Sequence, residues 1–456
     1  MILLIACAPS AELITLEAPS FGHVPVEVLV DPDVEVQGVT VGGVAAYGLI
    51  RTEEGLTATL QGLGEAGLAD VLIHTPEGEI FAGELDYLPA SDPLFDRVAG
   101  IGASLTQGVQ DGVPTFHANL MSPGAQISRQ VGANYGIPLL VDPLFPTIEP
   151  VHIGPAPECE SPPVVAHVTD AALEVLYVLN DDDGNFRYDL GRVDPDLPVY
   201  NAAVGGFQVG DLTRPLVDDF TRGFLGHMVL DPYADLNDDI PFSQVDVILE
   251  RDPTLVVCFD TFGNDLIGAV VLGSEVDLGA ITSEEEMEED MRRLMDQLSE
   301  GSDAEIFLAN SPRPGLLPAA RNQVLRAEDP ESEQAKVDEA DAITVRYNAL
   351  FAELAAEYPR VHVVDAYSYA EGLAETGLEA NGETLDTRMY GGLLSLDGVH
   401  FTDSGYAAFG NLFLDAIEEE LGVSAERIDL DAVAAEDIRT PSALRAEGFD
   451  VDACDR

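Results

Sequence analysis

The chain has 456 residues, of which 46% are hydrophobic, and it contains four cysteines and no tryptophan. Its 83 acidic residues against 21 basic ones give a formal net charge of -62 at pH 7. So large a negative charge repels phosphate backbones and anionic lipid surfaces, which argues against nucleic-acid binding. The length favours two or three folded units, and no apolar run reaches the roughly 18 residues that a membrane-spanning helix needs.

The first residues are apolar up to a small residue and a cysteine, Ala6-Cys7, which is how a bacterial lipoprotein signal ends. No charged segment precedes this apolar run. We interpret residues 1–18 as a leader or truncated lipoprotein signal, with a lipid anchor at Cys7. We therefore expect an exported protein, either an outer-membrane or cell-surface lipoprotein or a secreted protein.

The remaining cysteines lie in two kinds of context. Cys159 and Cys454 lie in polar, loop-like sequence and are able to form a disulfide in an exported chain, although sequence alone does not establish the pairing. Cys258 lies in an apolar run and is expected to be a buried free thiol. No cysteine–histidine cluster in the sequence has the spacing of a zinc site.

Residues 19–90 contain short runs in which apolar and polar residues alternate with a period of two. Glycine-rich turn signals separate these runs, and the spacing predicts a small all-β sandwich. The clearest runs are Val26–Val30, Val39–Val41, Leu56–Leu60 and Asp70–His74. The string from Val39 to Ala46 and the turn Thr75-Pro76-Glu77-Gly78 resemble the IPT/TIG immunoglobulin-like domain. This resemblance implies a spacer or binding module on an extracellular protein.

A linker, Leu88–Pro93, leads into a second unit that we assign to residues 94–424. Its first element is a short buried strand that runs into a turn of small residues with one exposed serine, Ser104. The segment 111–198 is rich in proline and glycine and lacks strong periodicity, apart from a short helix near residues 122–130. A long connection of this kind typically covers a functional face.

One stretch of that segment, Asp181–Asn185, begins like a calcium-binding loop. Leu190 and Gly191 stand where the closing glutamate of an EF-hand would be. We interpret the stretch as an acidic hairpin turn. A calcium-dependent adhesion module is the alternative that depends on it.

The rest of the second unit alternates apolar strands with amphipathic helices. Four further strands are expected at Pro198–Asn201, Thr254–Phe259, Glu305–Ala309 and Val361–Asp365. Two helices carry apolar stripes, formed by Met287, Met291, Leu294, Met295 and Leu298 and by Ile343, Tyr347, Leu350, Phe351 and Leu354. Five apolar strands with helical crossovers predict a parallel sheet covered on both faces, a three-layer α/β/α fold. A helix is expected at residues 405–421, and residues 425–456 are expected to form an acidic C-terminal tail.

In a parallel sheet of this kind, chemistry gathers at the carboxyl ends of the strands. Four motifs fall at such positions in order: Ser104, Gly205-Gly206, Asn264-Asp265, and Asp397 with His400. Their order resembles the SGNH, or GDSL-type, serine hydrolase family over about residues 95–421. The resemblance implies a flavodoxin-like five-stranded sheet, a Ser-His-Asp triad, and neither a cofactor nor a metal ion.

The residue types suit acyl transfer. A serine hydroxyl becomes an effective nucleophile when a base removes its proton during attack, and the resemblance gives that role to His400, oriented by Asp397. The negative oxygen of the tetrahedral intermediate needs pre-set donors. The resemblance supplies these from the backbone N–H groups of Ser104 and Gly206 and from the side-chain amide of Asn264.

Three positions leave the site open to more than one interpretation. Gly205 is a rival to Gly206 as the oxyanion donor. The family usually has aspartate directly before the nucleophile, where this chain has Ala103, and it usually has glycine two residues before the asparagine, where this chain has Phe262. The aspartate is best viewed as a support that hydrogen-bonds around the turn. We therefore expect a looser or slower site.

These observations favour a serine esterase or lipase-like hydrolase of carboxylic esters. The substrate is a lipid ester, an aryl ester or an acetyl group on a polysaccharide, and the loop-rich segment resembles the lipase-like branch of the family. The negative surface suits neutral substrates. We expect a monomer. The alternative is a catalytically impaired, SGNH-like surface protein that acts in binding.

Overall fold

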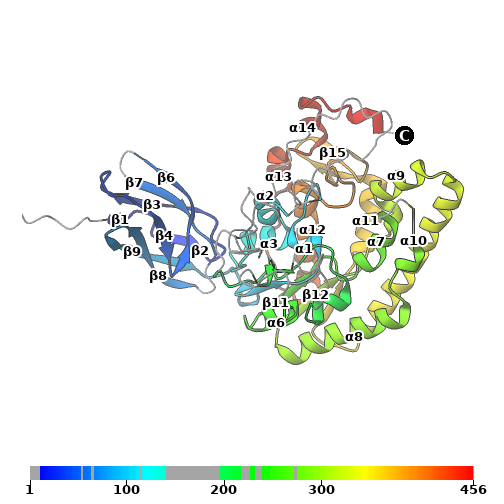
Figure 1. Ribbon diagram of the computed structural model, residues 1–456, viewed down its shortest axis with the longest axis horizontal. Helices are drawn as coiled ribbons and strands as arrows, with labels where there is room; N and C mark the ends of the chain where they lie inside the picture. Colours follow the sequence, from blue (N-terminus) through cyan, green and yellow to red (C-terminus); the bar gives the residue numbers. More distant parts are fainter. Residues whose placement is uncertain are drawn as a thin grey trace, which may run out of the picture.

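The computed structural model describes residues 11–52, 55–62, 66–112, 114–139, 196–216, 226–227, 229–231, 239–271 and 275–454. The predicted lipid anchor at Cys7, the cysteine Cys159 and the calcium-like stretch Asp181–Asn185 lie outside these residues, as does most of segment 111–198. Figure 1 shows strands β1 to β9, in blue, at one end of the molecule and a larger mixed α/β part at the other.

Two sheets make up the N-terminal part of the described chain, with strand orders β1-β3-β7-β6 and β2-β9-β8-β4-β5. The strands are β1 (Ala11–Leu13), β2 (Glu17–Pro19), β3 (Pro25–Val30), β4 (Gly38–Val41), β5 (Val44–Ala45), β6 (Tyr47–Arg51), β7 (Gly55–Thr59), β8 (Gly67–Thr75) and β9 (Gly78–Leu88). Strands β3, β4, β7 and β8 are the four that the period-two pattern predicts.

The two sheets share one apolar core. Exposed and buried residues alternate along β3, so that Val26 and Val28 both face inward, and β8 adds Val71 and Ile73. Successive side chains of a strand point to opposite faces, which is why burial follows a period of two. Strand β1 pairs with β3 and β2 pairs with β9. Residues 11–18, which the sequence analysis assigned to a leader, therefore belong to this β part.

The second part contains a parallel sheet with the order β10-β11-β12-β13. Its strands are β10 (Val98–Gly100), β11 (Leu255–Cys258), β12 (Glu305–Ala309) and β13 (Val361–Val364). The prediction of a mixed α/β fold with a parallel sheet is confirmed.

The sheet differs from the prediction at its β10 edge. In the described residues the expected strand at 198–201 is an isolated parallel bridge between Asn201 and Gly100. The backbone N–H groups of Tyr200 and Asn201 both donate to the carbonyl of Gly136, so a regular ladder does not continue there. Within the described residues, the sheet thus has four strands and one bridge in place of five strands.

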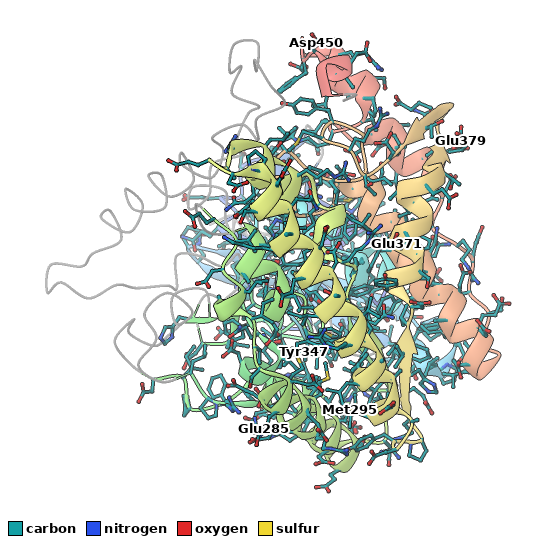
Figure 2. All side chains as sticks on the ribbon, turned by 90° about the vertical axis from the view of Figure 1, so that its right-hand side faces the viewer. Glu285, Met295, Tyr347, Glu371, Glu379 and Asp450 are labelled. Carbon is teal, nitrogen blue, oxygen red and sulfur yellow. The ribbon has the colours of Figure 1, made fainter. Side chains whose placement is uncertain are left out.

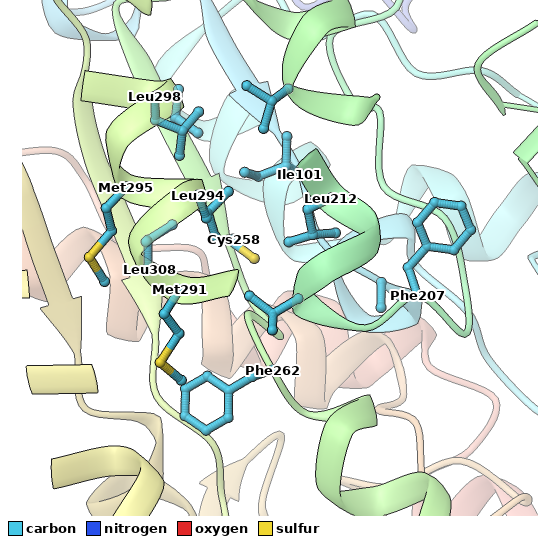
Figure 3. Packing of buried hydrophobic residues seen from close by; sticks show 14 of the residues in the cluster. Ile101, Phe207, Leu212, Cys258, Phe262, Met291, Leu294, Met295, Leu298 and Leu308 are labelled. Carbon is cyan, nitrogen blue, oxygen red and sulfur yellow. The ribbon is translucent and has the colours of Figure 1, made fainter. Parts of the chain in front are cut away.

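Helices cover both faces of this sheet. Val256 and Cys258 of β11 lie in one buried cluster with residues of α6, α8 and α10, whereas Leu255 and Val257 lie in another with residues of α3 and α12. These helices are α3 (Pro123–Val131), α6 (Gln244–Leu249), α8 (Glu284–Gly301), α10 (Pro330–Ala355) and α12 (Asp403–Leu421). Figure 3 shows the first cluster, in which side chains of α8 lie beside Cys258 and Leu308.

The predicted apolar stripes are the inner faces of α8 and α10. All five stripe residues of α8 are fully buried. In α10, Tyr347, Phe351 and Leu354 are buried, and Ile343 and Leu350 are half-buried against the same cluster. Thr402 caps α12, because its side-chain oxygen accepts a hydrogen bond from the N–H of Gly405. Buried apolar stripes and capping residues together explain why these helices form where the sequence predicts them.

The remaining elements connect the layers and end the chain. They are η1 (Pro93–Phe95), α1 (Ser104–Gln107), α2 (Phe116–Leu120), η2 (Val209–Thr213), α7 (Asn264–Val271), η3 (Leu278–Ala280), η4 (Pro314–Leu316), α9 (Pro318–Arg326), α11 (Ala366–Thr376), β14 (Leu378–Ala380), β15 (Glu383–Leu385), α13 (Leu430–Glu436), α14 (Pro441–Ala446) and η5 (Val451–Cys454). The predicted C-terminal tail is folded: Leu444 and Val451 pack against Met389, Tyr390 and Leu396 in a small apolar cluster.

Carboxylates dominate the surface. Glu284, Glu285 and Glu286 are all exposed in the first turn of α8, and Figure 2 shows labelled carboxylates such as Glu285, Glu379 and Asp450 at the outside of the molecule. Among the described helices, none combines the length and the apolar composition that crossing a membrane requires.

The charge predicts that salt stabilises the fold. A net charge of -62 opposes compaction by self-repulsion. Raising NaCl from about 0.1 M to about 1 M shortens the Debye length from about 10 Å to about 3 Å and screens this repulsion. We expect the Tm measured by scanning calorimetry to rise over this range, and to rise equally in KCl. A Tm that stays constant or falls would contradict the prediction.

Candidate functional site

The predicted nucleophile lies directly after the first strand of the parallel sheet. Strand β10 ends at Gly100, and half-buried Ser104 opens the single helical turn α1. Between them, Gly102 has a φ of 135°. A Cβ at Gly102 would lie 2.5 Å from Oδ1 of Asp260 and 2.6 Å from Oγ1 of Thr106. Both its backbone conformation and the lack of space therefore require glycine there.

A carboxylate from the neighbouring strand end holds this turn. Oδ1 of Asp260 accepts hydrogen bonds from Ala103 N at 2.9 Å and Thr106 Oγ1 at 2.7 Å, and Oδ2 accepts one from Leu105 N at 2.7 Å. Burial raises the pKa of Asp260, against the effect of these hydrogen bonds. The sequence analysis missed Asp260. The available signal is a single carboxylate directly after the apolar run that ends at Phe259.

The two glycines of the second motif differ in their backbone N–H groups. The N–H of Gly205 donates to Oε1 of Gln107 at 2.9 Å. Gly206 is exposed, has a φ of 83°, and has no atom within 4 Å of the position of a Cβ. Among the described residues, no acceptor lies within hydrogen-bond distance of Gly206 N. Gly206 N is thus available to a ligand, whereas Gly205 N is occupied.

Asn264 connects the end of β11 to the segment after the Asn201 bridge. It is the first residue of α7, and its Nδ2 donates to the carbonyl oxygen of Phe207 at 2.9 Å. An amide group carries two N–H bonds, so one remains for a further acceptor. The backbone N–H of Ser104 also has no acceptor among the described residues. Three donors with free capacity therefore come from the ends of β10 and β11 and from the segment after the Asn201 bridge.

The predicted acid and base are in contact. Nδ1 of His400 lies 2.6 Å from Oδ2 of Asp397. Oδ1 of Asp397 accepts hydrogen bonds from Val399 N at 2.8 Å, His400 N at 2.9 Å and Ser395 Oγ at 3.1 Å. These bonds fix the carboxylate on one tight turn before α12. With Nδ1 engaged by Asp397, Nε2 is the nitrogen that remains free to accept a proton.

The pKa values of this pair move apart. Burial opposes ionisation of Asp397, but its Coulombic attraction to His400 and their hydrogen bond prevail and lower the pKa of Asp397 to about 2. Burial likewise opposes protonation of His400, but attraction to Asp397 raises the pKa of His400 above its ordinary value, with smaller contributions from Asp260 and Asp111. The pair is therefore arranged to stabilise an imidazolium ion.

The turn that carries Asp397 and His400 is called the acid–base turn below. A buried ion pair connects it to the segment after Ser104. Asp111 accepts from Leu396 N at 2.7 Å through Oδ1, and its own N–H donates to Ser395 Oγ at 3.0 Å. Its Oδ2 accepts from both Nε, at 2.9 Å, and Nη2 of Arg439. Both side chains of the pair are 8% exposed. Arg439 lies in the predicted tail, and the sequence analysis named neither residue.

Further contacts join the two halves of the site. Tyr406 Oη, on α12, donates to the carbonyl of Val109 at 2.6 Å. A Cβ built at Gly112 would lie 4.0 Å from Oδ2 of Asp397. The segment that begins five residues after Ser104 thus runs along the acid–base turn.

Asp260 interacts with the surroundings of both Ser104 and His400. Asp260 hydrogen-bonds the residues next to Ser104 in sequence, and its charge acts on His400. No hydrogen bond joins Ser104 Oγ to His400, and both residues are among those that the structure describes. Catalytic hydrogen bonds are often long or poorly aligned without substrate.

His117, on α2, contacts a carboxylate. Its Nε2 lies 2.8 Å from Oδ2 of Asp403, and its side chain is 57% exposed. The hydrogen bond to Asp403 raises the pKa of His117. Gln110 Nε2 donates to the other oxygen of Asp403. These contacts anchor α2 to the first turn of α12.

Phe262 packs in the core. It is 1% exposed and belongs to the buried cluster with α8 and α10, where its ring lies 5.4 Å from that of Phe351 in an edge-on arrangement. Figure 3 shows its ring beside Met291. The larger side chain at this position therefore fills the interior. Within the described residues, no group of three or more His, Cys, Asp or Glu side chains is arranged to hold a metal ion.

No protein-family model matches the chain, and no curated protein sequence matches it. Among the solved structures that it resembles is a carbohydrate acetylesterase from Xanthomonas citri. The match has 10% sequence identity and a TM-score of 0.27, and it covers 91% of this chain and 76% of the other. A similarity at this TM-score establishes neither a common fold nor a common function, so the functional proposal below depends on the geometry of the site.

The ion pair of Asp111 and Arg439 predicts an asymmetric stability effect. Arg439→Met leaves an uncompensated carboxylate in the interior, which is expected to cost about 3–5 kcal/mol in free energy of unfolding. The double variant with Asp111→Asn is expected to recover part of that loss. Urea denaturation of the full chain measures both.

The matched control is Arg445→Ala in the same segment. Arg445 pairs with Asp452 at 2.9 Å, and their side chains are 51% and 74% exposed. Such a pair contributes about 0–1 kcal/mol. Equal losses for Arg439→Met and Arg445→Ala would refute a special role of the buried pair.

Proposed function

We propose that this protein is a serine hydrolase of the SGNH type that cleaves carboxylic esters, with Ser104 as nucleophile, His400 as base and Asp397 as the acid that orients it. The observation that carries the proposal is the buried Asp397–His400 pair at 2.6 Å, connected by hydrogen bonds to the segment that follows a half-buried serine. The order Asn201, β10, β11, β12, β13 supports a flavodoxin-like sheet.

The reaction proceeds in two acyl-transfer steps. Ser104 Oγ attacks the ester carbonyl while its proton passes to Nε2 of His400. The imidazolium is stabilised by Asp397 and then gives that proton to the leaving alkoxide, so that the alcohol departs and an acyl-serine remains. Water attacks the acyl-serine with His400 again as base, which releases the carboxylic acid and restores Ser104.

The tetrahedral intermediate in each step carries a negative oxygen. We assign its donors to Ser104 N, Gly206 N and the remaining N–H of Asn264, because these have free capacity while Gly205 N is engaged by Gln107. Donors that are fixed before the reaction do not need to reorganise when charge develops. Loss of one such donor typically lowers turnover by about 10²–10³-fold.

The negative surface supports a neutral substrate: a lipid ester, an aryl ester or an acetylated polysaccharide. We further propose that the chain acts outside the cytoplasm, as a lipoprotein or a secreted enzyme of the lipase-like branch. In that setting the β1–β9 part, resembling an IPT/TIG domain, serves as a spacer or binding module.

The first test removes the nucleophile. Ser104→Ala is expected to abolish hydrolysis of a series of p-nitrophenyl esters of increasing acyl length, by up to about 10⁶-fold, and to abolish labelling by a fluorophosphonate probe. The control is Ser332→Ala, at an exposed serine in the first turn of α10. Folding of each variant is checked by circular dichroism.

The outcome separates two classes of function. If the native protein neither turns over esters nor takes up the probe, or if Ser104→Ala labels equally well, the enzyme proposal fails. The missing Ser104–His400 hydrogen bond and the alanine at position 103 would then support the second candidate, a catalytically impaired surface protein that binds ligands.

The second test uses pH. His400 must be neutral to accept a proton, and attraction to Asp397 raises its pKa. The acidic limb of kcat/KM is therefore expected to have its midpoint above about 6.5, the ordinary value for histidine. Asp397→Asn removes that attraction and leaves the effect of burial, so the midpoint is expected to move to lower pH while kcat falls by about 10⁴-fold. A limb that does not move would contradict the role given to Asp397.

A further inference from the structure

We propose that Asp260 is a positioning residue for the nucleophile. From the end of β11 it holds the serine turn, residues 102–106, by a set of hydrogen bonds that we call the clamp. The clamp thereby sets the positions of the Ser104 hydroxyl and of the Ser104 N–H. This inference rests on the proposed function, since it concerns the geometry in which Ser104 attacks. Asp260 touches neither substrate nor the reacting atoms, and it acts through the backbone of the turn.

The first argument is the pattern of donors around the serine. Asp260 takes the N–H groups of Ala103 and Leu105, which flank Ser104, and the hydroxyl and N–H of Thr106. In the described structure, Ser104 N is the N–H of this turn that remains without an acceptor. One carboxylate thus fixes the turn from one side and leaves free the donor that an oxyanion hole needs.

The second argument is that the clamp needs an ionised carboxylate. All its partners are donors, and both oxygens of Asp260 accept. The hydroxyl of Thr106 accepts from Phe259 N at 3.0 Å, so its own proton points to Asp260. A neutral amide at position 260 would turn an N–H toward another N–H at one of its two ends. The turn would then lose hydrogen bonds in a buried place, where unsatisfied donors are costly.

Ala103 suits the apolar surroundings of its side chain, and Asp260 supplies the carboxylate that position 103 lacks. The methyl group of Ala103 is 1% exposed and lies in the apolar cluster with Ile101 and Phe262. A carboxylate on residue 103 would enter that apolar cluster, whereas Asp260 reaches the same backbone N–H groups from the end of β11. Because Asp260 supplies a carboxylate to this turn, the absence of an aspartate at position 103 does not by itself imply a looser turn.

The negative charge of Asp260 also acts on His400. The carboxylate of Asp260 is near enough to His400 to favour its protonated form, in addition to the effect of Asp397. Since His400 becomes an imidazolium during attack, the clamp also contributes to the field in which the proton moves. A residue that only stabilised the fold would leave that field unchanged.

The experiment compares Asp260→Asn with Glu333→Gln in the full chain. Glu333, on α10, is the matched control because it is also a buried carboxylate that accepts a hydrogen bond from a backbone N–H, that of Val276, and one from Lys336 Nζ at 3.0 Å, but none from the serine turn. The readouts are kcat and KM on a p-nitrophenyl ester, the pH profile, the Tm, and hydrogen–deuterium exchange of peptides that cover the turn.

For Asp260→Asn we expect kcat to fall by about 10²-fold, which is typical of a misplacement near 1 Å, with KM little changed. The acidic limb is expected to move to lower pH, and amides of residues 103–106 are expected to exchange faster. Glu333→Gln is expected to change the Tm without these effects. If both variants lose activity in proportion to the Tm, with unmoved pH limbs, Asp260 is only structural and the inference is overturned.

Hydrogen exchange separates failure of this inference from failure of the proposed function. Should the native chain hydrolyse no ester, faster exchange of the turn in Asp260→Asn alone would still support the clamp. Unchanged exchange in an active Asp260→Asn variant would refute the clamp while the proposed function stands. Asp260→Glu, which keeps the charge and lengthens the side chain, is expected to retain the pH limb but not full kcat.

Discussion

The hydrogen bonds of the buried carboxylate of Asp111 are the interaction on which the site depends. Asp111 accepts from Leu396 N on one oxygen and from Arg439 on the other, and its backbone N–H reaches Ser395. Three segments that are far apart in the sequence therefore meet at one residue. Without it the acid–base turn would be held on the serine side mainly through α12, by contacts such as the hydrogen bond from Tyr406 Oη to the carbonyl of Val109.

The carboxylates of this protein thus lie in two different environments. Outside, an excess of acidic residues stays solvated and repels. Inside, each of the carboxylates at the site is satisfied by donors: Asp397 by a histidine and two backbone N–H groups, Asp260 by the serine turn, and Asp111 by an arginine. A buried ionised group is tolerated only when it is paired or hydrogen-bonded. Arg439, one of only 21 basic residues, is therefore placed where it neutralises the buried Asp111.

Patterns that arise from burial could be predicted from the sequence. The stripe from Met287 to Leu298 and the alternation in β3 follow directly from which face is covered. The strand expected at 198–201 was wrong, because hydrogen bonds to Gly136 replace a regular ladder there. The motif residues Asp397 and His400 could be found because they are neighbours in sequence. Their contact is local, so spacing carries the information.

Asp260 and Arg439 could not be found in this way, because each works on a partner more than a hundred residues distant in sequence. A single carboxylate after a strand and an arginine in a weakly patterned tail have no periodicity of their own. The sequence could show that Ala103 lacks a carboxylate, but only the parallel pairing of β10 with β11 brings another one to the same N–H groups. The position before a serine nucleophile is therefore best judged by which carboxylate reaches the turn, from any strand, and not by the residue at that position alone.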